Sequence, residues 1–415
     1  MIQFSPPRID QKIIDAVNET LRSGWITTGP KTKLFEKKLT EYAGHHATLC
    51  VSSATAGLEL MLRWFGVNEG DEVVVPAYTY AATANVVEHC GAKVVFVDSD
   101  RDFNVSVQAI EHAITPRTKV IIPVDIAGFP CDYEALNSLV NHADIKKMFL
   151  PRTKEQEMLG RILVLSDAAH SLGALFHGKK AGNLCEVTVF SFHAVKNLTT
   201  AEGGAVCLNL PEPFDNLKVY QSLNIKSLHG QTKDAMAKNQ AGSWHYDIIE
   251  PGYKFNMTDI QASMGLVELE RYDNDMLARR KQIFDAYARA FSTYPWAQIP
   301  VYETADRKTS YHVFLLRVKG IAEEQRDRIM SEIFRREVSV NVHFVPLPMM
   351  SYYKNRGYSI ADYPVAYDNY SRVITLPVYY DLTDRMVQMV VEAVVKSVRD
   401  ITGQKLNQDC SPDKG

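Results

Sequence analysis

Two side chains of this 415-residue chain have the chemistry and the setting of catalytic groups. Lys196 follows the aromatic run Val187–Phe192 and precedes a loop of small residues that ends in two glycines. A lysine in such a setting can be desolvated, which favours the neutral amine that attacks a carbonyl. Asp167 ends the apolar run Ile162–Asp167, where it could pair with a cationic ring nitrogen or, alternatively, cap a following helix.

Two further features lie upstream of this pair. The segment VSSATAG (51–57) joins a predicted strand to a predicted helix, and its small residues leave the first helical N–H groups free for a phosphate. Many helices begin with serine or threonine, so this pattern is not specific on its own. Tyr78 and Tyr80 follow the run Glu72–Val75 and could offer an aromatic face to a ligand ring or belong to the core.

In chain order these features are a helix N-terminus that could bind an anion, an aromatic side chain, an acid and a lysine. Each lies just after a predicted strand. Pyridoxal 5'-phosphate (PLP) uses such a set, because a lysine forms its Schiff base and an acid pairs with its pyridinium nitrogen. The residues therefore predict a PLP site.

Short β-rich runs alternate with helical patterns from about residue 47 to 210. Near-continuous apolar strands in this alternation indicate an α/β fold, with a mainly parallel sheet covered on both faces. Ligands of such sheets bind beyond the carboxyl ends of the strands, where the candidate residues lie. The expected strands are Thr48–Ser52, Glu72–Val75, Lys93–Asp98, Lys119–Val124, Ile162–Asp167, Val187–Phe192 and Ala205–Leu208. The expected helices are Ala56–Phe65, Ala81–His89, Val107–Ala113 and Tyr133–Asn141.

A different pattern starts at Thr258, where Thr-Asp-Ile-Gln predicts a capping box and a helix follows with a break near Asn274. Strands over 313–318 and 338–344 and helices over 326–335 and 385–398 then indicate a smaller α+β unit. We expect a large PLP-binding domain over residues 1–270, a small domain over 271–403 and a disordered tail over 404–415.

Two internal segments lack a clear pattern. Residues 144–161 are charged and contain a proline, which predicts an irregular surface excursion between a helix and the next strand. Residues 224–250 are polar and weakly periodic, and a connection of that length is usually functional.

Composition narrows the class of protein. The 46 basic and 49 acidic residues give a net charge of -3, which offers no cationic surface for nucleic acid, and 46% hydrophobic content excludes disorder as the main state. The six cysteines are scattered without metal-ligand spacing, so we expect reduced thiols and no metal site. No secretory signal or membrane span is visible, so we expect a cytoplasmic protein.

Ordered motifs over residues 3–400 resemble the DegT-type (DegT/DnrJ/StrS) PLP-dependent sugar aminotransferases, which have the aspartate-aminotransferase fold, PLP fold type I. The UDP-4-amino-4-deoxy-L-arabinose aminotransferase type shares the SSATAG, DAAH and SFHAxKNxTxAEGG patterns. The matching motifs are SGWITTGP (23–30), SSATAG (52–57), GDEVVVP (70–76), SDAAH (166–170), FSFHAVKN (190–197), EGG (202–204), PGYKFN (251–256) and VHFVPLP (342–348).

The resemblance implies roles for matching residues. Lys196 would hold PLP as a Schiff base and shuttle the proton, and Asp167 would pair with the pyridine nitrogen. Tyr80 would stack on the ring, and His170 would lie near the ring or its phenolic oxygen. Asn256 would reach the phosphate of the neighbouring subunit's cofactor, which implies a homodimer with shared active sites. The phosphate would be held within the subunit by Ser53, Ala54, Thr55 and Ser191.

The resemblance also implies the reaction. An amino acid, L-glutamate, would donate its amino group through a pyridoxamine phosphate intermediate to a UDP- or dTDP-4-keto sugar, for cell-surface polysaccharide or lipopolysaccharide precursors. A related branch with histidine at the position of Lys196 dehydrates sugars instead. For one of the candidate sugar contacts, His343, a role as a buried core histidine is equally consistent with the sequence. Residues that could touch the nucleotide sugar are Trp25, Thr27, Thr28, His193 and His343.

Two departures from the family pattern limit which residue roles can be carried over to this sequence. The segment over 144–161 is longer than the usual connection, and Asp125 stands where many members have histidine, so no sugar contact is carried over to either place. Two alternatives stay open: a PLP enzyme of another reaction type, such as an amino-acid aminotransferase or a lyase, and a non-catalytic protein of this fold. The presence of both Lys196 and Asp167 argues against the second.

Overall fold

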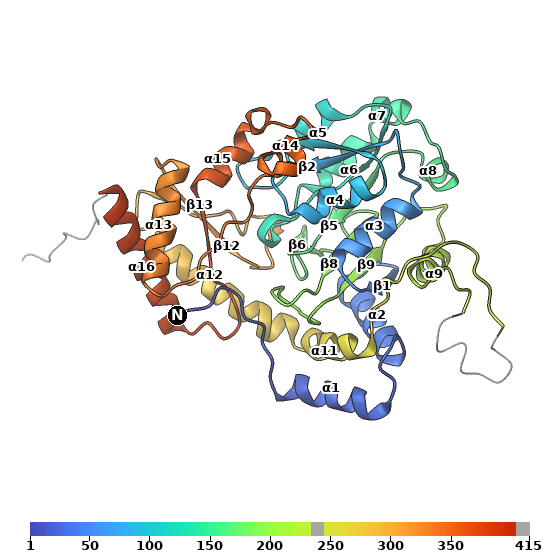
Figure 1. Cartoon of the computed structure of the whole chain (residues 1–415), viewed down its shortest axis with the longest axis horizontal. Coiled ribbons are helices and arrows are strands. Elements are labelled where there is room, and N and C mark those ends of the chain that lie inside the picture. The colour runs from blue at the N-terminus through green and yellow to red at the C-terminus, as the bar shows by residue number, and fades with distance from the viewer. Residues whose placement is uncertain (234–244, 404–415) are drawn as a thin grey trace, which may run out of the picture.

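The computed structural model describes residues 1–233 and 245–403, and its largest layer is a seven-stranded sheet (Figure 1). Strand β9 is antiparallel to both of its neighbours, β1 and β8, and the remaining neighbours pair in parallel. This confirms the predicted α/β fold with a mainly parallel sheet. The spatial order is β1 (Ala47–Val51), β9 (Gly204–Leu208), β8 (Val187–Ser191), β5 (Leu163–Asp167), β4 (Thr118–Ile121), β2 (Glu72–Pro76) and β3 (Lys93–Val97).

Strands β1, β2, β4, β5 and β9 are buried along their whole length, and because side chains alternate between faces, both faces of the sheet are covered. Helix α3 (Ala54–Trp64) packs directly on the sheet through Gly57, where a Cβ would lie 2.9 Å from Val189 and 3.0 Å from Val206. Other helices of this unit include α1 (Gln11–Ser23), α2 (Pro30–Ala43), α4 (Ala81–His89), α5 (Val107–Ala113), α6 (Tyr133–Asn141), α9 (Asn216–Ser227) and α11 (Asp259–Glu270).

A smaller unit follows along the chain, on the left in Figure 1. Its antiparallel sheet has the order β10 (Ala297–Gln298), β12 (Phe314–Val318) and β13 (Val373–Leu376). Its helices are α12 (Ala278–Phe291), α13 (Glu323–Arg335), α14 (Ser351–Lys354), α15 (Pro364–Arg372) and α16 (Asp384–Thr402). A third, small sheet joins the two units, because β11 (Arg307–Lys308) pairs with β6 (Leu175–Phe176), which pairs with β7 (Lys179–Lys180).

The connection between the units is helical. Thr258 caps α11 in the predicted capping box with Gln261, and the expected break near Asn274 is a π-helical turn over Tyr272–Leu277. The chain therefore crosses residue 270 inside a helical run, and the domain boundary there stays a prediction. The N-terminus also reaches the smaller unit, because the Ile2 N–H donates to the Glu337 carbonyl at 2.7 Å.

The segment over 144–161 is not irregular as expected. It contains α7 (Ala143–Met148) and α8 (Lys154–Leu159). Capping residues define both ends of α8: the Thr153 side chain accepts from the Gln156 N–H at the start, and Gly160 ends the helix at φ 65°. Gln156 then donates from Nε2 to the Phe65 carbonyl at 2.9 Å, which fixes this excursion against the end of α3.

The expected strand over 338–344 is also wrong. Its backbone forms only isolated bridges, Val338 with Ile2 and Asn341 with Thr375. Side chains take the N–H groups that a ladder would use: Asn341 Oδ1 accepts from the Val342 N–H at 2.8 Å, and Thr375 Oγ1 accepts from the His343 N–H at 3.1 Å.

Two sequence predictions fall partly or wholly outside the described residues. The predicted tail over 404–415 lies outside them, as do residues 234–244 of the polar segment over 224–250. The first part of that segment, up to Ser227, is the end of helix α9, so the expected loop begins later than predicted.

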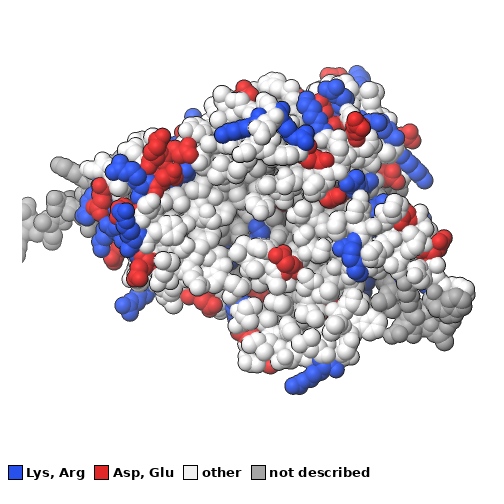
Figure 2. All heavy atoms as spheres, viewed as in Figure 1, with Lys and Arg blue, Asp and Glu red and all other residues white. Residues whose placement is uncertain are grey.

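Charged side chains lie mainly around the edge of the face in Figure 2, and its hollowed middle carries few of them. Within residues 1–233 and 245–403, no helix is both long and apolar enough to span a bilayer, and no group of three metal-ligating side chains occurs. Cys50, Cys90, Cys131, Cys185 and Cys207 are buried free thiols.

Candidate active site

A cavity of about 430 Å³ lies beyond the carboxyl ends of β1, β2, β5 and β8, and the smaller unit closes its other side. It brings together most of the residues that the sequence singled out. The predicted residues that line it are Ser53, Ala54, Thr55, Tyr80, Asp167, His170, Ser191, His193, Lys196 and His343.

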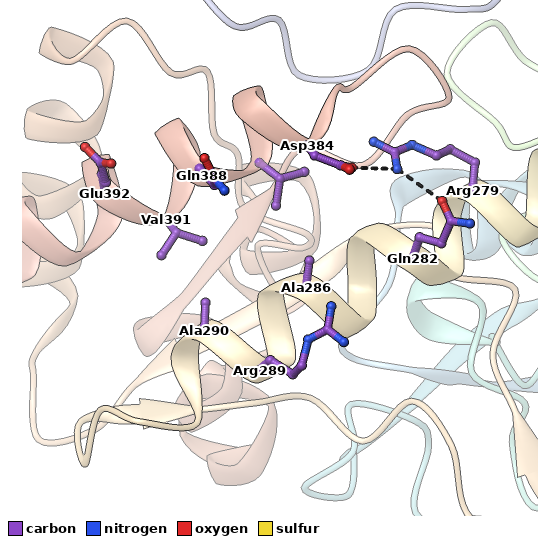
Figure 3. A pocket seen from close by; sticks show the side chains of 10 residues that line it. Arg279, Gln282, Ala286, Arg289, Ala290, Asp384, Gln388, Val391 and Glu392 are labelled. Carbon is purple, nitrogen blue, oxygen red and sulfur yellow. Dashed lines mark hydrogen bonds and ion pairs between the residues drawn. The ribbon is translucent and has the colours of Figure 1, made fainter.

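A second hollow of about 740 Å³ lies between α12 and α16 in the smaller unit (Figure 3). Arg279 stands at one end of it, 2.8 Å from Asp384 and 3.1 Å from Gln282. Its lining contains none of the predicted site residues, so the chemistry belongs to the first cavity.

Asp167 is buried at the end of β5, with 6% of its surface exposed. Thr83 donates to its Oδ2 at 2.8 Å, and the Ala169 N–H donates to its Oδ1 at 3.2 Å. Burial raises the pKa of Asp167, although both hydrogen bonds and the charge of Lys196 act in the opposite direction. The capping alternative is wrong, because β5 leads through turns to β6 and no helix begins there.

Lys196 lies on a tight turn after β8, which its N–H closes by donating to the His193 carbonyl at 2.9 Å. Burial lowers the pKa of Lys196 to about 8, and the attraction of Asp167 offsets only part of that effect. A substantial fraction of the amine is therefore neutral near physiological pH, as a nucleophile or a proton acceptor requires.

The N-terminus of α3 fits a phosphate group. Ser53 is its N-cap and accepts from the Ala56 N–H at 3.0 Å, which leaves the first-turn N–H groups of Ala54 and Thr55 without intrahelical acceptors. A Cβ at Gly204 would lie only 2.5 Å from the Ala54 nitrogen, so glycine is what allows β9 to approach this turn so closely.

The two candidate tyrosines have different environments. Tyr78 is fully buried and its hydroxyl donates to the His343 carbonyl, so the core alternative is correct for it. Tyr80 is 64% exposed, lines the cavity and lies 5.9 Å from the Phe344 ring. Of the two, Tyr80 is thus available to a ligand ring.

Histidines form one wall of the cavity. The His170 ring lies 5.8 Å from Phe344, and the His343 ring stacks on Phe4 at 5.5 Å. The Nδ1 atoms of both histidines are buried and have no hydrogen-bond partner among the described residues. Burial lowers the pKa of His170 well below its ordinary value and that of His343 to about 4, so both rings are neutral near pH 7.

Several residues at the site had no role predicted from the sequence, and four of them matter most for its geometry. Thr83, which donates a hydrogen bond to Asp167, lies in the first turn of α4, and Phe4 lines the cavity from the N-terminal segment. His312 and Phe344 come from the smaller unit. No local pattern marks Phe4, Thr83 or His312, and Phe344 lies in the VHFVPLP motif (342–348) without an assigned role of its own. The roles of all four depend on contacts between segments far apart in the chain.

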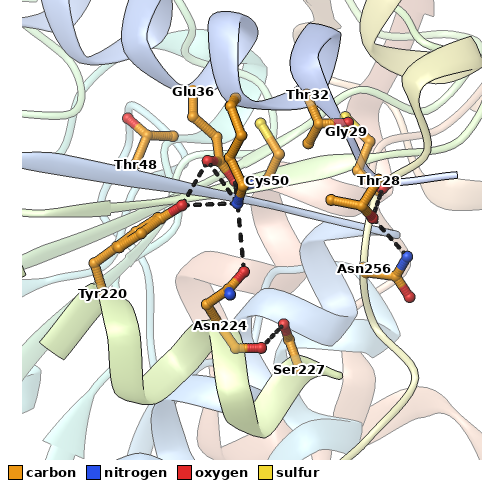
Figure 4. A network of polar contacts seen from close by, with 12 residues as sticks. Thr28, Gly29, Thr32, Glu36, Thr48, Cys50, Tyr220, Asn224, Ser227 and Asn256 are labelled. Carbon is orange, nitrogen blue, oxygen red and sulfur yellow. Dashed lines mark hydrogen bonds and ion pairs between the residues drawn. The ribbon is translucent and has the colours of Figure 1, made fainter. Parts of the chain in front are cut away.

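Four predicted residues do not line the cavity. They gather instead beside the N-terminus of α2, where Figure 4 shows Thr28 and Asn256. Asn256 donates from Nδ2 to Thr28 Oγ1 at 2.7 Å, and Trp25 donates from Nε1 to the Thr28 carbonyl at 3.2 Å. The Thr27 carbonyl accepts from the Asp259 N–H at 3.1 Å. Their predicted contacts with a cofactor or sugar are therefore not made inside this cavity.

Buried carboxylates hold this neighbouring region in place. Asp259 accepts from the N–H groups of Gly29 at 2.8 Å and Thr32 at 2.9 Å, and so caps α2, whose own N-cap residue is glycine. Glu36 on α2 accepts from Lys33 at 3.1 Å and Tyr220 at 2.8 Å (Figure 4). These bonds connect α2 to α11 and α9.

Asp125 does not face the cavity. It is fully buried and accepts hydrogen bonds from the hydroxyls of Ser171 at 2.6 Å and Tyr133 at 2.9 Å and from the Cys131 N–H at 2.9 Å. Burial raises its pKa to about 6. Its position supports the turn after Asp167 rather than a ligand.

Known proteins resemble the whole chain. Spr1654 from Streptococcus pneumoniae, assigned as a sugar aminotransferase, is 44% identical in its PMP form, with a TM-score of 0.93 over 97% of this chain and 100% of its own. Its PLP form is 43% identical, with a TM-score of 0.91. The spore coat polysaccharide biosynthesis protein SpsC of Bacillus subtilis is 35% identical over 95% of this chain and 96% of its own.

A more distant structure is PseC of Helicobacter pylori, an aminotransferase involved in the biosynthesis of pseudoaminic acid. It is 27% identical, with a TM-score of 0.84 over 96% of this chain and 99% of its own. The sequence profile of the DegT/DnrJ/EryC1/StrS aminotransferases matches residues 7–149 and 153–395. The cavity thus lies in a chain that belongs to the DegT/DnrJ/EryC1/StrS aminotransferase family.

Proposed function

We propose that this protein is a PLP-dependent sugar aminotransferase. It transfers an amino group from L-glutamate to the keto group of a nucleotide-linked sugar, a UDP- or dTDP-4-keto sugar, for cell-surface polysaccharide or lipopolysaccharide precursors in the cytoplasm. The family supports the amino transfer. The names of SpsC and Spr1654 support the sugar and the polysaccharide, and the solved forms of Spr1654 support the cofactor.

One observation carries this proposal. A lysine whose pKa is lowered to about 8 shares one cavity with a buried aspartate and the free N-terminus of a helix. This set fits PLP, because it provides an amine for the aldehyde, an anion for the ring nitrogen and N–H donors for the phosphate.

Bound PLP supplies an aldehyde for amines and an electron-withdrawing ring. In the proposed roles, Asp167 holds the ring nitrogen, and Thr83 and Ala169 keep its carboxylate in place through their hydrogen bonds. The N–H groups of Ala54 and Thr55 hold the phosphate, together with the Ser191 hydroxyl. Tyr80 covers one ring face, and neutral His170 lies near the ring without adding positive charge beside Lys196.

Lys196 moves the proton. Its neutral Nζ accepts the proton that leaves the α-carbon of the amino donor, and its ammonium returns a proton when the sugar is aminated. A pKa near 8 suits both directions, because neither protonation state is rare at neutral pH.

The same proposal includes a homodimer with shared sites. Asn256 and the Trp25–Thr28 segment lie outside the cavity of their own subunit, which supports a role toward the site of a second copy. Several large apolar side chains of the N-terminal region are exposed and suit such a contact: Ile9, Ile14, Leu21, Ile26 and Leu34.

The decisive experiment measures 2-oxoglutarate formed from glutamate with and without a 4-keto nucleotide sugar. We expect formation to depend on the sugar and the amino-sugar product to appear in equal amount. Formation that depends on a 2-oxo acid instead would establish an amino-acid aminotransferase. Lys196→Ala is expected to abolish turnover, whereas Lys146→Ala, an exposed change on α7, serves as the matched control.

A second measurement tests the cofactor directly. Hydride reduction of the PLP-loaded protein, followed by digestion and mass spectrometry, is expected to place the adduct on Lys196. Asp167→Ala is expected to weaken cofactor binding and slow both half-reactions. An adduct on another lysine would refute the assignment of Lys196.

A further inference from the structure

We propose that His312 is a positioning residue for Lys196 and acts on it through the Asn197 side chain; its kinetic consequence rests on the proposed function. No sequence motif assigned a role to His312. It reaches the cavity from the smaller unit, just before β12, and its side chain lies between the lysine turn and His170.

The hydrogen bonds around Asn197 define the direction of this contact. His312 Nδ1 lies 2.8 Å from Asn197 Oδ1, and Asn197 Nδ2 donates to the Ser310 carbonyl at 2.7 Å. Because a carbonyl only accepts, the amide nitrogen must face Ser310 and the amide oxygen must face His312. His312 Nδ1 therefore carries the proton and donates it to Asn197.

This bond fixes the backbone next to the reactive amine. Asn197 directly follows Lys196 and is only 4% exposed, so its side chain has no water to replace a lost donor. The segment that bears His312 is itself fixed, because the Ser310 N–H donates to the Gly128 carbonyl at 3.0 Å and Arg280 donates to the His312 carbonyl at 2.9 Å.

His312 also supports a second group of the site. Its ring centroid lies 4.2 Å from that of His170, and the two planes are 34° apart. Ser310 adds a bond from its hydroxyl to the His170 carbonyl at 2.5 Å. Burial and the nearby charge of Lys196 keep the pKa of both imidazoles well below 6.5, so this contact adds no positive charge beside the lysine.

Two substitutions separate the hydrogen bond from the packing. His312→Asn places an amide nitrogen close to the position of Nδ1 and keeps a donor for Asn197, but it removes the ring from His170. His312→Phe keeps a ring against His170 and cannot donate. A residue that acts through its bond to Asn197 tolerates the first change better than the second, and a residue that only fills space does the opposite.

The main readout needs neither cofactor nor sugar. Lys196 in the cofactor-free protein is acylated over a range of pH, and its modification is followed by mass spectrometry. We expect the wild type to give a midpoint near its pKa of about 8. In His312→Phe the loosened turn exposes the amine to water, and we expect the midpoint to rise by about one pH unit or more. His312→Asn is expected to stay within about half a unit of the wild type.

Asn197→Leu tests the same bond from the other side. It should raise the Lys196 midpoint as His312→Phe does, and the double variant should show no larger shift than the larger single one, because both remove one interaction. Additive shifts, or a midpoint that moves with His312→Asn and not with His312→Phe, would overturn the proposal. If His312→Phe does not fold, the comparison of Asn197→Leu with His312→Asn decides the question.

In the loaded enzyme, His312→Phe is expected to lower kcat about tenfold or more and to change the KM for glutamate less than about twofold, because the lysine is displaced while the substrate contacts remain. An enzyme without transaminase activity would refute the proposed function and leave the acylation result intact. An unchanged midpoint in an active enzyme would refute the role of His312 alone.

Discussion

The lowered pKa of Lys196 has a consequence for stability that Lys196→Met in the cofactor-free protein can measure. Methionine has a similar length and carries no ionisable group, so it removes the titration and keeps most of the volume. Burial is the main cause of the shift, and the cost of that burial falls on the charged form. The variant is therefore expected to be more stable than the wild type at neutral pH, where the wild-type lysine is mostly protonated.

The size of this effect follows from linkage. The pKa falls from 10.5 to about 8 on folding, so between these values the unfolded chain holds a proton that the folded chain has lost. The free energy of unfolding of the wild type must then rise with pH in this window, by about 3 kcal/mol in full and by about 2 kcal/mol between about pH 7 and about pH 9.5. The free energy of unfolding of Lys196→Met lacks this rise with pH.

Urea unfolding of both proteins at the two pH values provides the measurement. The stability advantage of Lys196→Met should shrink by about 2 kcal/mol as the pH rises. Lys146→Met, an exposed substitution on α7, is the control and should give no such change in its difference from the wild type. An advantage that is equal at both pH values would show that the folded protein does not depress the pKa of Lys196, and the argument for its reactivity would fail.

Three other substitutions test the supports of the site. Gly204→Ala places a methyl group 2.5 Å from the Ala54 nitrogen and is expected to cost about 2 kcal/mol in urea unfolding and to weaken cofactor binding, measured by absorbance titration. Asp259→Ala removes the cap of α2 and should cost about 2 kcal/mol of unfolding free energy, whereas Asp259→Asn, which keeps an acceptor, should cost less. Phe4→Ala removes the ring stacked on His343, a predicted sugar contact, and should raise the KM for the keto sugar severalfold, with about 1 kcal/mol of stability lost; an unchanged KM would refute a role of Phe4 in sugar binding.

The sheet and the main catalytic pair could be predicted from the sequence for the same physical reason. Strands buried on both faces must be apolar along their length, so they stand out in the sequence, and a polar residue at the end of such a strand has few other places to lie. Asp167 and Lys196 are marked in this way, and the structure brings both into one cavity.

Where prediction failed, local signals competed with contacts that the sequence does not display. Helix α8 is short, and its cap at Thr153 gives no apolar repeat that would indicate a helix. Residues 338–344 have the apolar alternation of a strand, but Asn341 and Thr375 side chains take the N–H groups that a ladder needs. In both cases hydrogen bonds to single side chains decide the backbone conformation, and periodicity does not report them.

Two of the residues that were given no role from the sequence, His312 and Phe344, share an origin that explains both why they were missed and why they matter. The sheet supplies Asp167, Lys196 and the phosphate cradle, while His312, His343 and Phe344 come from the smaller unit, where no rule about strand ends applies. Desolvation is what lowers the pKa of Lys196, and residues of the smaller unit line one side of its cavity. We therefore expect that substitutions in the smaller unit that loosen its contact with the large unit change the fraction of neutral amine at Lys196, even where they never touch a substrate.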